Sequence, residues 1–301
     1  MKSAMTEQSG FFDPPVQEEN FPPSTLEPLS VSGSGLTRLY LCREGGRSRV
    51  YKALAPQYCG DPLYENLLRK EFEIGFSAMH LHICEYYAYK QIPRIGNAIE
   101  MEWIDGKTLE QLMDEGALTP DMSRKILDEL CDALAYLHRK QIFHRDIKPG
   151  NIMVTNHGGN VKLIDFSCAD SDLHYANKGA SGTRRYASPE LVAGKPVDAR
   201  TDIYSLGILI GEMAPRLKRI AQRCTEADPE RRFPSVEVLR TALRRQNVFR
   251  RLTRSVALSL VIIAMAVLSV RSVTRQNQAR HIDQAVQETA DRIRETLQDP
   301  H

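Results

Sequence analysis

The sequence lacks the cysteine spacing of a zinc site or of a disulfide-bonded framework. Its six cysteines are scattered and no two of them form a C-x-x-C pair, so we expect reduced thiols in a cytosolic domain. A strong excess of charge is also missing, because the formal net charge is +2, and we therefore expect no nucleic-acid partner. No apolar run follows Met1, which argues against a cleaved secretory signal.

The 301 residues that are present suit one two-lobed domain with appendages, or two small domains. A hydrophobic content of 42% can support a sizeable core. Residues 1–30 differ in composition, since they combine several prolines with acidic residues and few regularly spaced apolar ones. Burial in such a segment cannot offset the entropy lost on ordering, so the segment is predicted to be disordered.

Residues 255–270 form an uncharged apolar run between Arg254 and Arg271. As a helix this run would rise about 24 Å, which is less than the ~30 Å hydrocarbon core of a bilayer. The flanking residues extend the run, because arginine side chains can reach the lipid headgroups. The pattern predicts a transmembrane helix over residues 253–271, and a buried core helix is the alternative.

Arginines are denser before this apolar run than after it. The basic excess places the preceding side in the cytoplasm, so we expect a cell-membrane protein with a short extracytoplasmic tail over residues 272–301. Apolar residues recur in this tail at three- and four-residue steps, which predicts either an amphipathic helix or a short coiled coil. These residues are Ile282, Val286, Ala290, Ile293 and Leu297.

The chemistry of the chain is concentrated in residues 144–151, which read His-Arg-Asp-Ile-Lys-Pro-Gly-Asn, and in an Asp-Phe pair that begins at Asp165. Phosphoryl transfer needs a carboxylate that orients the attacking hydroxyl and accepts its proton, and Asp146 can supply it. Lys148 can neutralise charge on the moving phosphate, while Asn151 and Asp165 can ligate a metal ion. A motif of this length and order rarely arises by chance.

Hydrophobic periodicity predicts strands in the first part of this region and helices in the second. This order implies an α+β fold with an N-terminal sheet lobe and a C-terminal helical lobe. The predicted strands are residues 39–42, 49–54, 84–92 and 97–103, and the predicted helices are residues 64–80, 109–113 and 122–139.

From Val31 to Leu243 these motifs follow one another as in the eukaryotic-type Ser/Thr protein kinases, a family also found in bacteria as single-pass membrane kinases. The chain resembles this family over residues 31–247, which we take as the kinase domain. The resemblance implies a two-lobed protein-kinase fold, with ATP and Mg²⁺ (or Mn²⁺) as cofactors and proteins as substrates.

The resemblance also assigns a nucleotide site. Gly33 and Gly35 match the loop that covers the ATP phosphates, where glycine lets the backbone approach closely. Residues 100–106 resemble the hinge between the two lobes. There the resemblance places Met101 at the back of the adenine pocket, and it assigns adenine hydrogen bonds to the backbone of Glu102 and Ile104.

Lys52 matches the family lysine that contacts the α- and β-phosphates and pairs with a helix glutamate. Glu71 and Glu73 are both candidates for this glutamate. Glu71 is favoured, because Glu73 points about 200° away around the helix. Gly75 occupies a position at which the family usually stacks an apolar side chain between the lobes, which implies that this helix is easily displaced.

Four further residues match structural supports of the family. The resemblance implies that Thr183 hydrogen-bonds near residues 144–151, the catalytic loop, and that Glu190 pairs with Arg232. It also implies that Asp202, on a buried helix, braces the catalytic loop. Lys148 and Thr183 together favour Ser/Thr acceptors, since the tyrosine-specific members usually lack that lysine.

We therefore predict an active, membrane-anchored Ser/Thr protein kinase that takes part in signalling. Three departures from the family pattern, at Arg38, Gly75 and Ser167, leave a second interpretation open. The chain would then be a pseudokinase scaffold that binds nucleotide and partners without efficient catalysis. A small-molecule kinase with the same catalytic loop is a third interpretation, although residues 182–190 favour protein substrates.

The C-terminal lobe is predicted to be shorter than usual. In the family a loop and a further helix normally follow the Asp202 helix, whereas here Pro215 opens a new helix almost at once. The missing helix is expected to leave Ile208 and Ile210 less covered, as a face for self-association or for a partner. The alternative is that residues 216–224 pack onto this face themselves.

Overall fold

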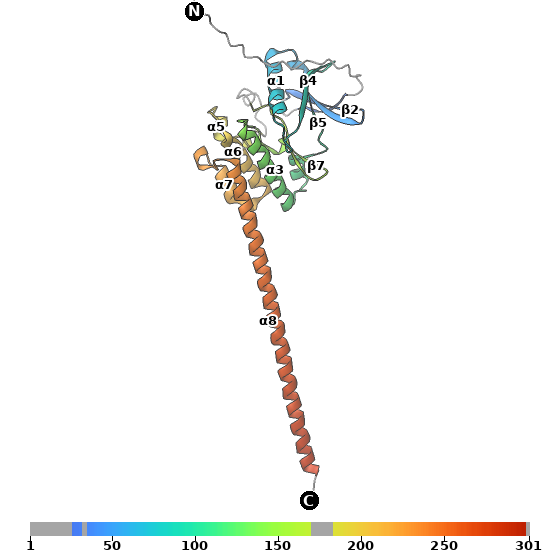
Figure 1. Ribbon diagram of the computed structural model, residues 1–301, viewed down its shortest axis with the longest axis vertical. Coiled ribbons are helices and arrows are strands. Elements are labelled where there is room, and N and C mark those ends of the chain that lie inside the picture. The colour runs from blue at the N-terminus through green and yellow to red at the C-terminus, as the bar shows by residue number, and fades with distance from the viewer. Residues whose placement is uncertain (1–25, 32–34, 170–182, 299–301) are drawn as a thin grey trace, which may run out of the picture. The chain divides into compact units, whose positions relative to one another are not determined.

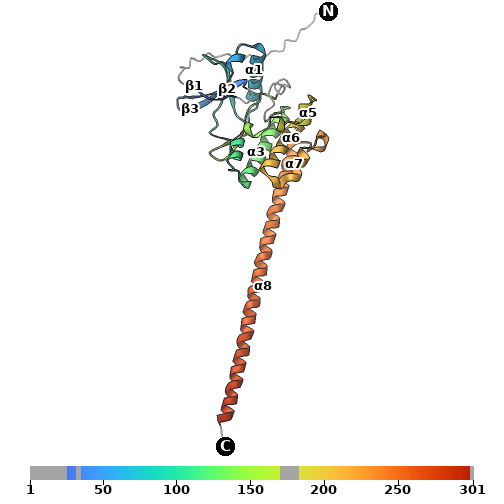
Figure 2. The same ribbon diagram turned by 180° about the vertical axis from the view of Figure 1, so that it is seen from behind.

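The computed structural model describes residues 26–31, 35–169 and 183–298 (Figure 1). The chain divides into two units, Met1–Leu243 and Arg244–His301. The first unit contains a five-stranded sheet with one helix and, after it, a mainly helical part (Figures 1 and 2). This arrangement confirms the two-lobed α+β fold that the sequence predicts.

The N-terminal lobe is built on an antiparallel sheet with the strand order β1-β2-β3-β5-β4. Strand β3 is central, and its register places Lys52 between Leu39 on β2 and Ile99 on β5. Lys52, the lysine predicted for the nucleotide site, is therefore carried by the central strand of the sheet. The strands are β1 (Leu26–Val31), β2 (Thr37–Glu44), β3 (Arg47–Leu54), β4 (Tyr86–Ile92) and β5 (Gly96–Glu102).

Strand β1 corrects one expectation. Residues 26–30 belong to the segment predicted to be disordered, yet they pair with β2, beginning with Leu26 opposite Cys42. The strand lies at the edge of the sheet, where a proline such as Pro28 is tolerated because one side of the strand needs no partner. Residues 1–25, the rest of that predicted segment, lie outside the described residues.

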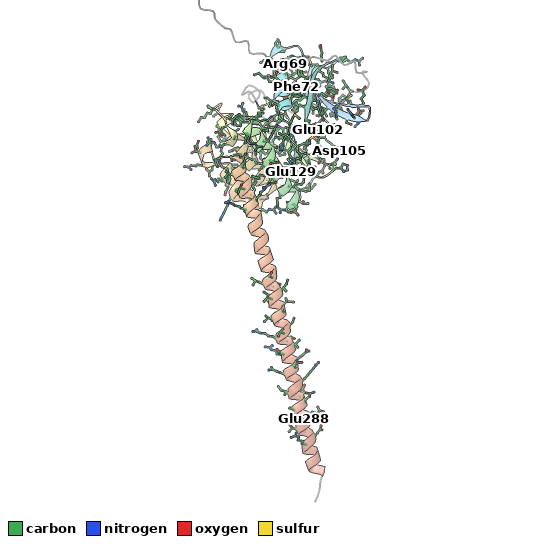
Figure 3. The ribbon with its side chains drawn as sticks, viewed as in Figure 1. Arg69, Phe72, Glu102, Asp105, Glu129 and Glu288 are labelled. Atoms are coloured by element: carbon green, nitrogen blue, oxygen red, sulfur yellow. The ribbon has the colours of Figure 1, made fainter. Side chains whose placement is uncertain are left out.

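Helix α1 (Pro62–Ser77) packs against the sheet of the N-terminal lobe. It begins at Asp61, whose side chain accepts a hydrogen bond from the N–H of Leu63, and Pro62 occupies the first turn. Figure 3 shows Phe72 on this helix. The residues that α1 buries are Leu67, Leu68, Glu71, Phe72 and Gly75.

The C-terminal lobe combines a small sheet, ordered β6-β7-β8, with helices around a buried core. The inward faces of α3 and α6 supply much of this core. The strands are β6 (Gly106–Thr108), β7 (Ile152–Thr155) and β8 (Val161–Leu163). The helices are α2 (Leu109–Asp114), α3 (Pro120–Arg139), α5 (Pro189–Val192), α6 (Ala199–Met213) and α7 (Lys218–Cys224). Short 3₁₀ turns are η2 (Pro56–Tyr58), η3 (Pro149–Asn151), η4 (Thr183–Arg185), η5 (Pro215–Leu217) and η6 (Pro229–Arg231).

Helix α7 follows α6 almost directly and covers it. The backbone of Gly207 on α6 lies so close to Cys224 on α7 that any larger side chain at position 207 would collide. Ile210 is 0% exposed and Ile208 is partly buried. The predicted uncovered apolar face is therefore wrong at Ile210, and the alternative, packing by residues 216–224, describes the structure.

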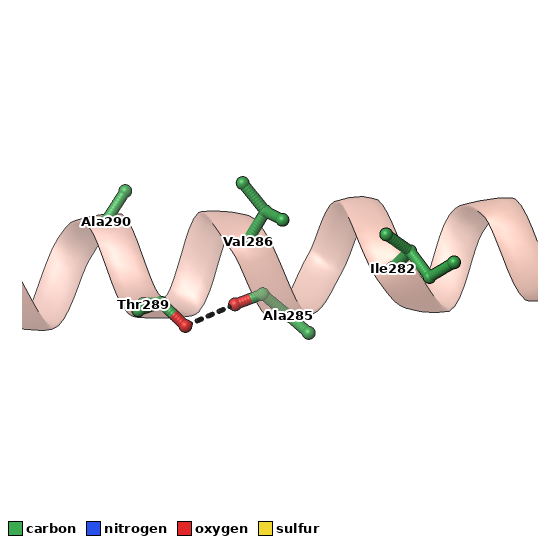
Figure 4. A pocket seen from close by; sticks show the side chains of 5 residues that line it. All are labelled: Ile282, Ala285, Val286, Thr289 and Ala290. Atoms are coloured by element: carbon green, nitrogen blue, oxygen red, sulfur yellow. Dashed lines mark hydrogen bonds between the residues drawn. The ribbon is translucent and has the colours of Figure 1, made fainter.

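Helix α8 (Val236–Gln298) begins in the first unit and continues through the second. Its segment Ser259–Arg292 is long and apolar enough to be a candidate membrane span, and its most apolar window is 0% buried. Farther along, Val286 and Thr289 lie on the same face of the helix, and the Thr289 hydroxyl donates to the Ala285 carbonyl at 2.7 Å (Figure 4). Within the described residues, the tail is helical up to Gln298, as both sequence alternatives required.

Candidate active site

Three of the residues predicted to carry out the chemistry, Asp146, Lys148 and Asn151, lie together on the loop between α3 and β7. Lys148 Nζ donates to Asp146 Oδ2 at 3.0 Å. Asn151 Nδ2 donates to the same oxygen at 3.0 Å and to the Asp146 carbonyl at 2.8 Å. Asp146 is only 4% exposed. These contacts fix the orientation of the Asp146 carboxylate and place a positive charge beside it.

The catalytic loop is held in place by Asp202, a fully buried residue of α6. Its carboxylate accepts hydrogen bonds from the backbone N–H groups of His144 at 2.9 Å and Arg145 at 2.8 Å. His138 Nε2, from the end of α3, lies 2.8 Å from the same carboxylate. Burial alone would raise the pKa of Asp202, but the contact with His138 and the backbone donors hold it below its ordinary value.

Lys52 contacts two carboxylates, those of Glu71 and Asp165. Its Nζ lies 2.6 Å from Glu71 Oε1 on α1 and 2.9 Å from Asp165 Oδ1. Burial would lower the pKa of Lys52, but the charges of Asp165 and Glu71 hold it above its ordinary value, so the ammonium stays charged. Glu73, the other candidate, is exposed. The structure therefore brings Glu71, and not Glu73, to Lys52.

The sheet register places two of the predicted nucleotide-binding residues near Lys52 along the strands, because Met101 and Glu102 on β5 lie opposite Val50 and Arg49 on β3. Gly33 falls outside the described residues, whereas Gly35 has a φ of 70°, a conformation that favours glycine. Met101 and Ile104 are buried. The Glu102 side chain (Figure 3) accepts a hydrogen bond from Lys162 at 2.9 Å, and its backbone N–H donates to the Glu85 carbonyl at 2.9 Å.

The segment after Asp165 points its aromatic side chain into the core. Phe166 is 1% exposed, and its ring centroid lies 5.2 Å from that of His144 and 5.9 Å from that of Tyr86. The N–H of Ser167 donates to Asp165 Oδ1 at 3.3 Å. Serine in place of the family glycine is thus compatible with an Asp165 side chain that faces Lys52.

Glu190 and Arg232 form the predicted ion pair in the C-terminal lobe. Two parallel hydrogen bonds of 2.7 and 2.8 Å join them, and the Thr201 hydroxyl donates to Glu190 at 2.9 Å. Burial would raise the pKa of Glu190, but the Arg232 guanidinium lowers it to about 2. Thr183 begins η4, and its side chain lies outside the described ones.

Asn151 and Asp165 fit the metal role that the family assigns to them. With its amide nitrogen bonded to Asp146, the group that Asn151 can offer a cation is its carbonyl oxygen. Asp165 adds carboxylate oxygens, and such hard oxygen ligands suit Mg²⁺, which usually takes few protein ligands and completes its shell with phosphate and water. In the described part of the chain no cluster of three His, Cys, Asp or Glu side chains could hold a metal by itself.

Sequence reasoning missed two residues that touch this site. His138 contacts Asp202, and the Tyr86 hydroxyl donates to Glu71 Oε1 at 3.2 Å. Both lie in segments that the hydrophobic pattern assigned correctly to a helix and a strand. Neither belongs to a recognisable motif, so only the folded arrangement reveals these contacts.

Comparison with known proteins places this site in a family. The family described as "Protein kinase domain" matches residues 35–230. Over 194 residues the chain is 33% identical to the "Probable serine/threonine-protein kinase PknB" of Corynebacterium glutamicum, covering 61% of this chain and 30% of that protein. It is 32% identical over 190 residues to the "Serine/threonine-protein kinase PrkC" of Bacillus subtilis, covering 61% of this chain and 29% of that protein.

These matches span only about a third of the curated relatives' own length. Among solved structures, the PknI kinase domain of Mycobacterium tuberculosis aligns with a TM-score of 0.58 at 23% identity. The alignment covers 74% of this chain and 96% of that domain. At this identity the likeness speaks for the fold alone.

Proposed function

The chain belongs to the protein kinase family, and we propose that it transfers the γ-phosphate of ATP to serine or threonine hydroxyls of other proteins. The observation that carries this proposal is the joint arrangement of two polar groups. Lys52 meets both Glu71 and Asp165, and Asp146 is oriented by Lys148 and Asn151. These are the parts that phosphoryl transfer requires.

In the proposed reaction Asp146 orients the acceptor hydroxyl and takes up its proton. Lys148, 3.0 Å from Asp146, stabilises negative charge on the phosphoryl group in transfer, and Lys52 holds the other phosphates. Asn151 and Asp165 would hold Mg²⁺, which supplies electrostatic screening of the phosphates. The pseudokinase alternative is not carried further, because these groups are all present and the relatives are named as kinases.

Radiolabel transfer from ATP to a generic protein tests the proposal on the full chain. Asp146→Asn and Lys52→Met should each lower the rate by about a hundredfold or more. Asp121→Asn and Lys107→Met are matched controls, since both side chains are exposed and far in sequence from the motif, and they should leave the rate unchanged. Equal activity in all four variants would contradict the kinase assignment.

We also propose that α8 anchors the protein in the cell membrane, with the kinase domain in the cytoplasm. The candidate span of α8 and the arginines that precede residues 255–270 support this topology. Reporter fusions after Arg245 should be cytoplasmic and fusions after Asp299 extracytoplasmic. A protein that stays in the soluble fraction would contradict the anchor and leave the catalytic proposal standing.

A further inference from the structure

Helix α1 and strand β4 meet where a glycine faces a tyrosine. Gly75 on α1 is buried, and a Cβ atom built on it would lie 2.6 Å from two ring carbons of Tyr86 on β4. Real Cβ atoms do not come so close to other heavy atoms. Tyr86 is 5% exposed, so its ring fills the space that a side chain at position 75 would otherwise occupy.

The hydroxyl of the same tyrosine contacts the carboxylate that pairs with Lys52. It donates to Glu71 Oε1 at 3.2 Å, and the same oxygen accepts from Lys52 at 2.6 Å. The Tyr86 ring also meets Phe166, the residue after Asp165, edge-on at 5.9 Å and 70°. One side chain thus contacts the helix, the carboxylate that pairs with Lys52, and the segment that carries Asp165.

We propose that Tyr86 is a positioning residue, which holds α1 where Glu71 meets Lys52, and that Gly75 is required because it admits the tyrosine ring. The inference rests on the proposed kinase function and adds a residue to it. It also revises the expectation that Gly75 leaves α1 easily displaced, because the missing side chain is replaced from the neighbouring strand.

The hydroxyl is suited to act as a permanent donor. Burial and the negative charge of Glu71 hold the pKa of Tyr86 well above its ordinary value. The phenol therefore keeps its proton over the pH range in which a cytoplasmic enzyme works. At 3.2 Å this hydrogen bond is longer than the roughly 2.5–2.7 Å of the strongest hydrogen bonds to carboxylates, so its loss should have a moderate effect.

The chain offers a matched control on the same pair of elements. Tyr89, also on β4, packs its ring 5.8 Å from Phe72 of α1, and its hydroxyl lies 3.4 Å from Glu65 of α1. It therefore joins the same strand to the same helix, but its hydroxyl does not reach the ion pair. A tyrosine that only fills the core should behave like Tyr89.

The test compares Tyr86→Phe with Tyr89→Phe in the full chain. Both variants keep their rings, so both should show similar, small changes in melting temperature. Tyr86→Phe should lower kcat/KM for ATP about tenfold and weaken nucleotide binding, which the single Trp103 of the hinge can report by its fluorescence. Tyr89→Phe should leave both unchanged.

Two further variants separate the ring from the hydroxyl. Gly75→Ala should displace the Tyr86 ring and reduce both stability and kcat/KM. The double variant Gly75→Leu/Tyr86→Ala moves the side-chain volume back to α1, so it should recover melting temperature but keep the tenfold loss in kcat/KM.

Equal kcat/KM and nucleotide affinity in wild-type, Tyr86→Phe and Tyr89→Phe proteins would overturn the role of Tyr86. An unfolded Tyr86→Phe protein would also overturn it, since the ring that fills the site is retained. A wild-type protein without phosphotransfer would contradict the proposed function, and the Trp103 titrations would still decide whether Tyr86 positions Lys52 for nucleotide.

Discussion

Asp202 and Glu71 are both buried carboxylates that support the site, at 0% and 3% exposure, but they are held by different groups. Asp202 accepts two backbone N–H groups of the catalytic loop, so the loop cannot move without breaking main-chain hydrogen bonds. Glu71 accepts hydrogen bonds from the side chains of Lys52 and Tyr86. A change of side-chain rotamer can alter these two contacts without breaking a main-chain hydrogen bond, and we call the α1 side the adjustable half of the site for this reason.

The largest effect should follow from removing the brace of the catalytic loop. Asp202→Ala leaves buried N–H groups of His144 and Arg145 without their acceptor, and it should lower the free energy of unfolding by about 4 kcal/mol. Asp202→Asn keeps one acceptor oxygen and should lose less. Urea denaturation measures both, and an Asp202→Ala loss below about 1 kcal/mol would remove the contrast between the two halves.

A somewhat smaller loss is expected at the second buried support. Arg232→Met leaves Glu190 without its guanidinium partner, and the free energy of unfolding should fall by about 3 kcal/mol. Because the folded pKa of Glu190 is lowered to about 2 from an ordinary value of 4.5, its contribution is complete above pH 4.5. That contribution is lost as the pH falls towards 2.

Unfolding measured as a function of pH tests this assignment. The wild-type protein should lose stability between pH 4.5 and about 2, and Arg232→Met should flatten this part of the curve. A curve of the same slope in both proteins would show that other carboxylates govern the acid limb.

The adjustable half should respond in activity rather than in stability. Glu71→Gln removes the charge that pairs with Lys52, while Asp165 remains 2.9 Å from the lysine. We expect kcat/KM for ATP to fall about tenfold or more, with little change in melting temperature. Glu73→Gln, two positions along the same helix and exposed, is the control and should match the wild type.

The smallest expected effect comes from the local start of helix α1. Asp61→Ala removes the side-chain acceptor of the Leu63 N–H, and it should cost about 1 kcal/mol of stability. Activity should be unchanged, because Glu71 lies more than two turns farther along the helix. A large drop in kcat/KM would mean that α1 is positioned from its own end rather than by Tyr86.

Residues of the site could be predicted from the sequence where they share one short motif, and could not be predicted where they meet only through folding. Asp146, Lys148 and Asn151 share one short loop, so a motif identifies all three, and the structure brings them together. The strand and helix pattern likewise predicted the two lobes. By contrast, Gly75 and Tyr86 are ordinary residues of a helix and a strand, and only the packing of these two elements gives the pair its meaning.

Two predictions were wrong, disorder at residues 26–30 and exposure at Ile210, because in both cases contacts between segments decide the structure. At residues 26–30 a proline-rich composition indicated disorder, but pairing with β2 supplies hydrogen bonds that composition does not encode. At Ile210 the absence of a family helix indicated exposure. Close approach at Gly207 lets α7 reach the face instead, and a single small residue is a weak signal in a sequence.

The backbone conformation at Arg145 and Asp165 costs the protein stability. Both are non-glycine residues with positive φ, at 61° and 68°, a conformation that costs an L-residue about 1–2 kcal/mol. Both also sit beside the reacting groups. A laboratory screen for heat resistance alone should therefore enrich glycine or asparagine at these positions and discard phosphate transfer. The heat resistance of the surviving clones would measure how much stability the natural protein gives up for its chemistry.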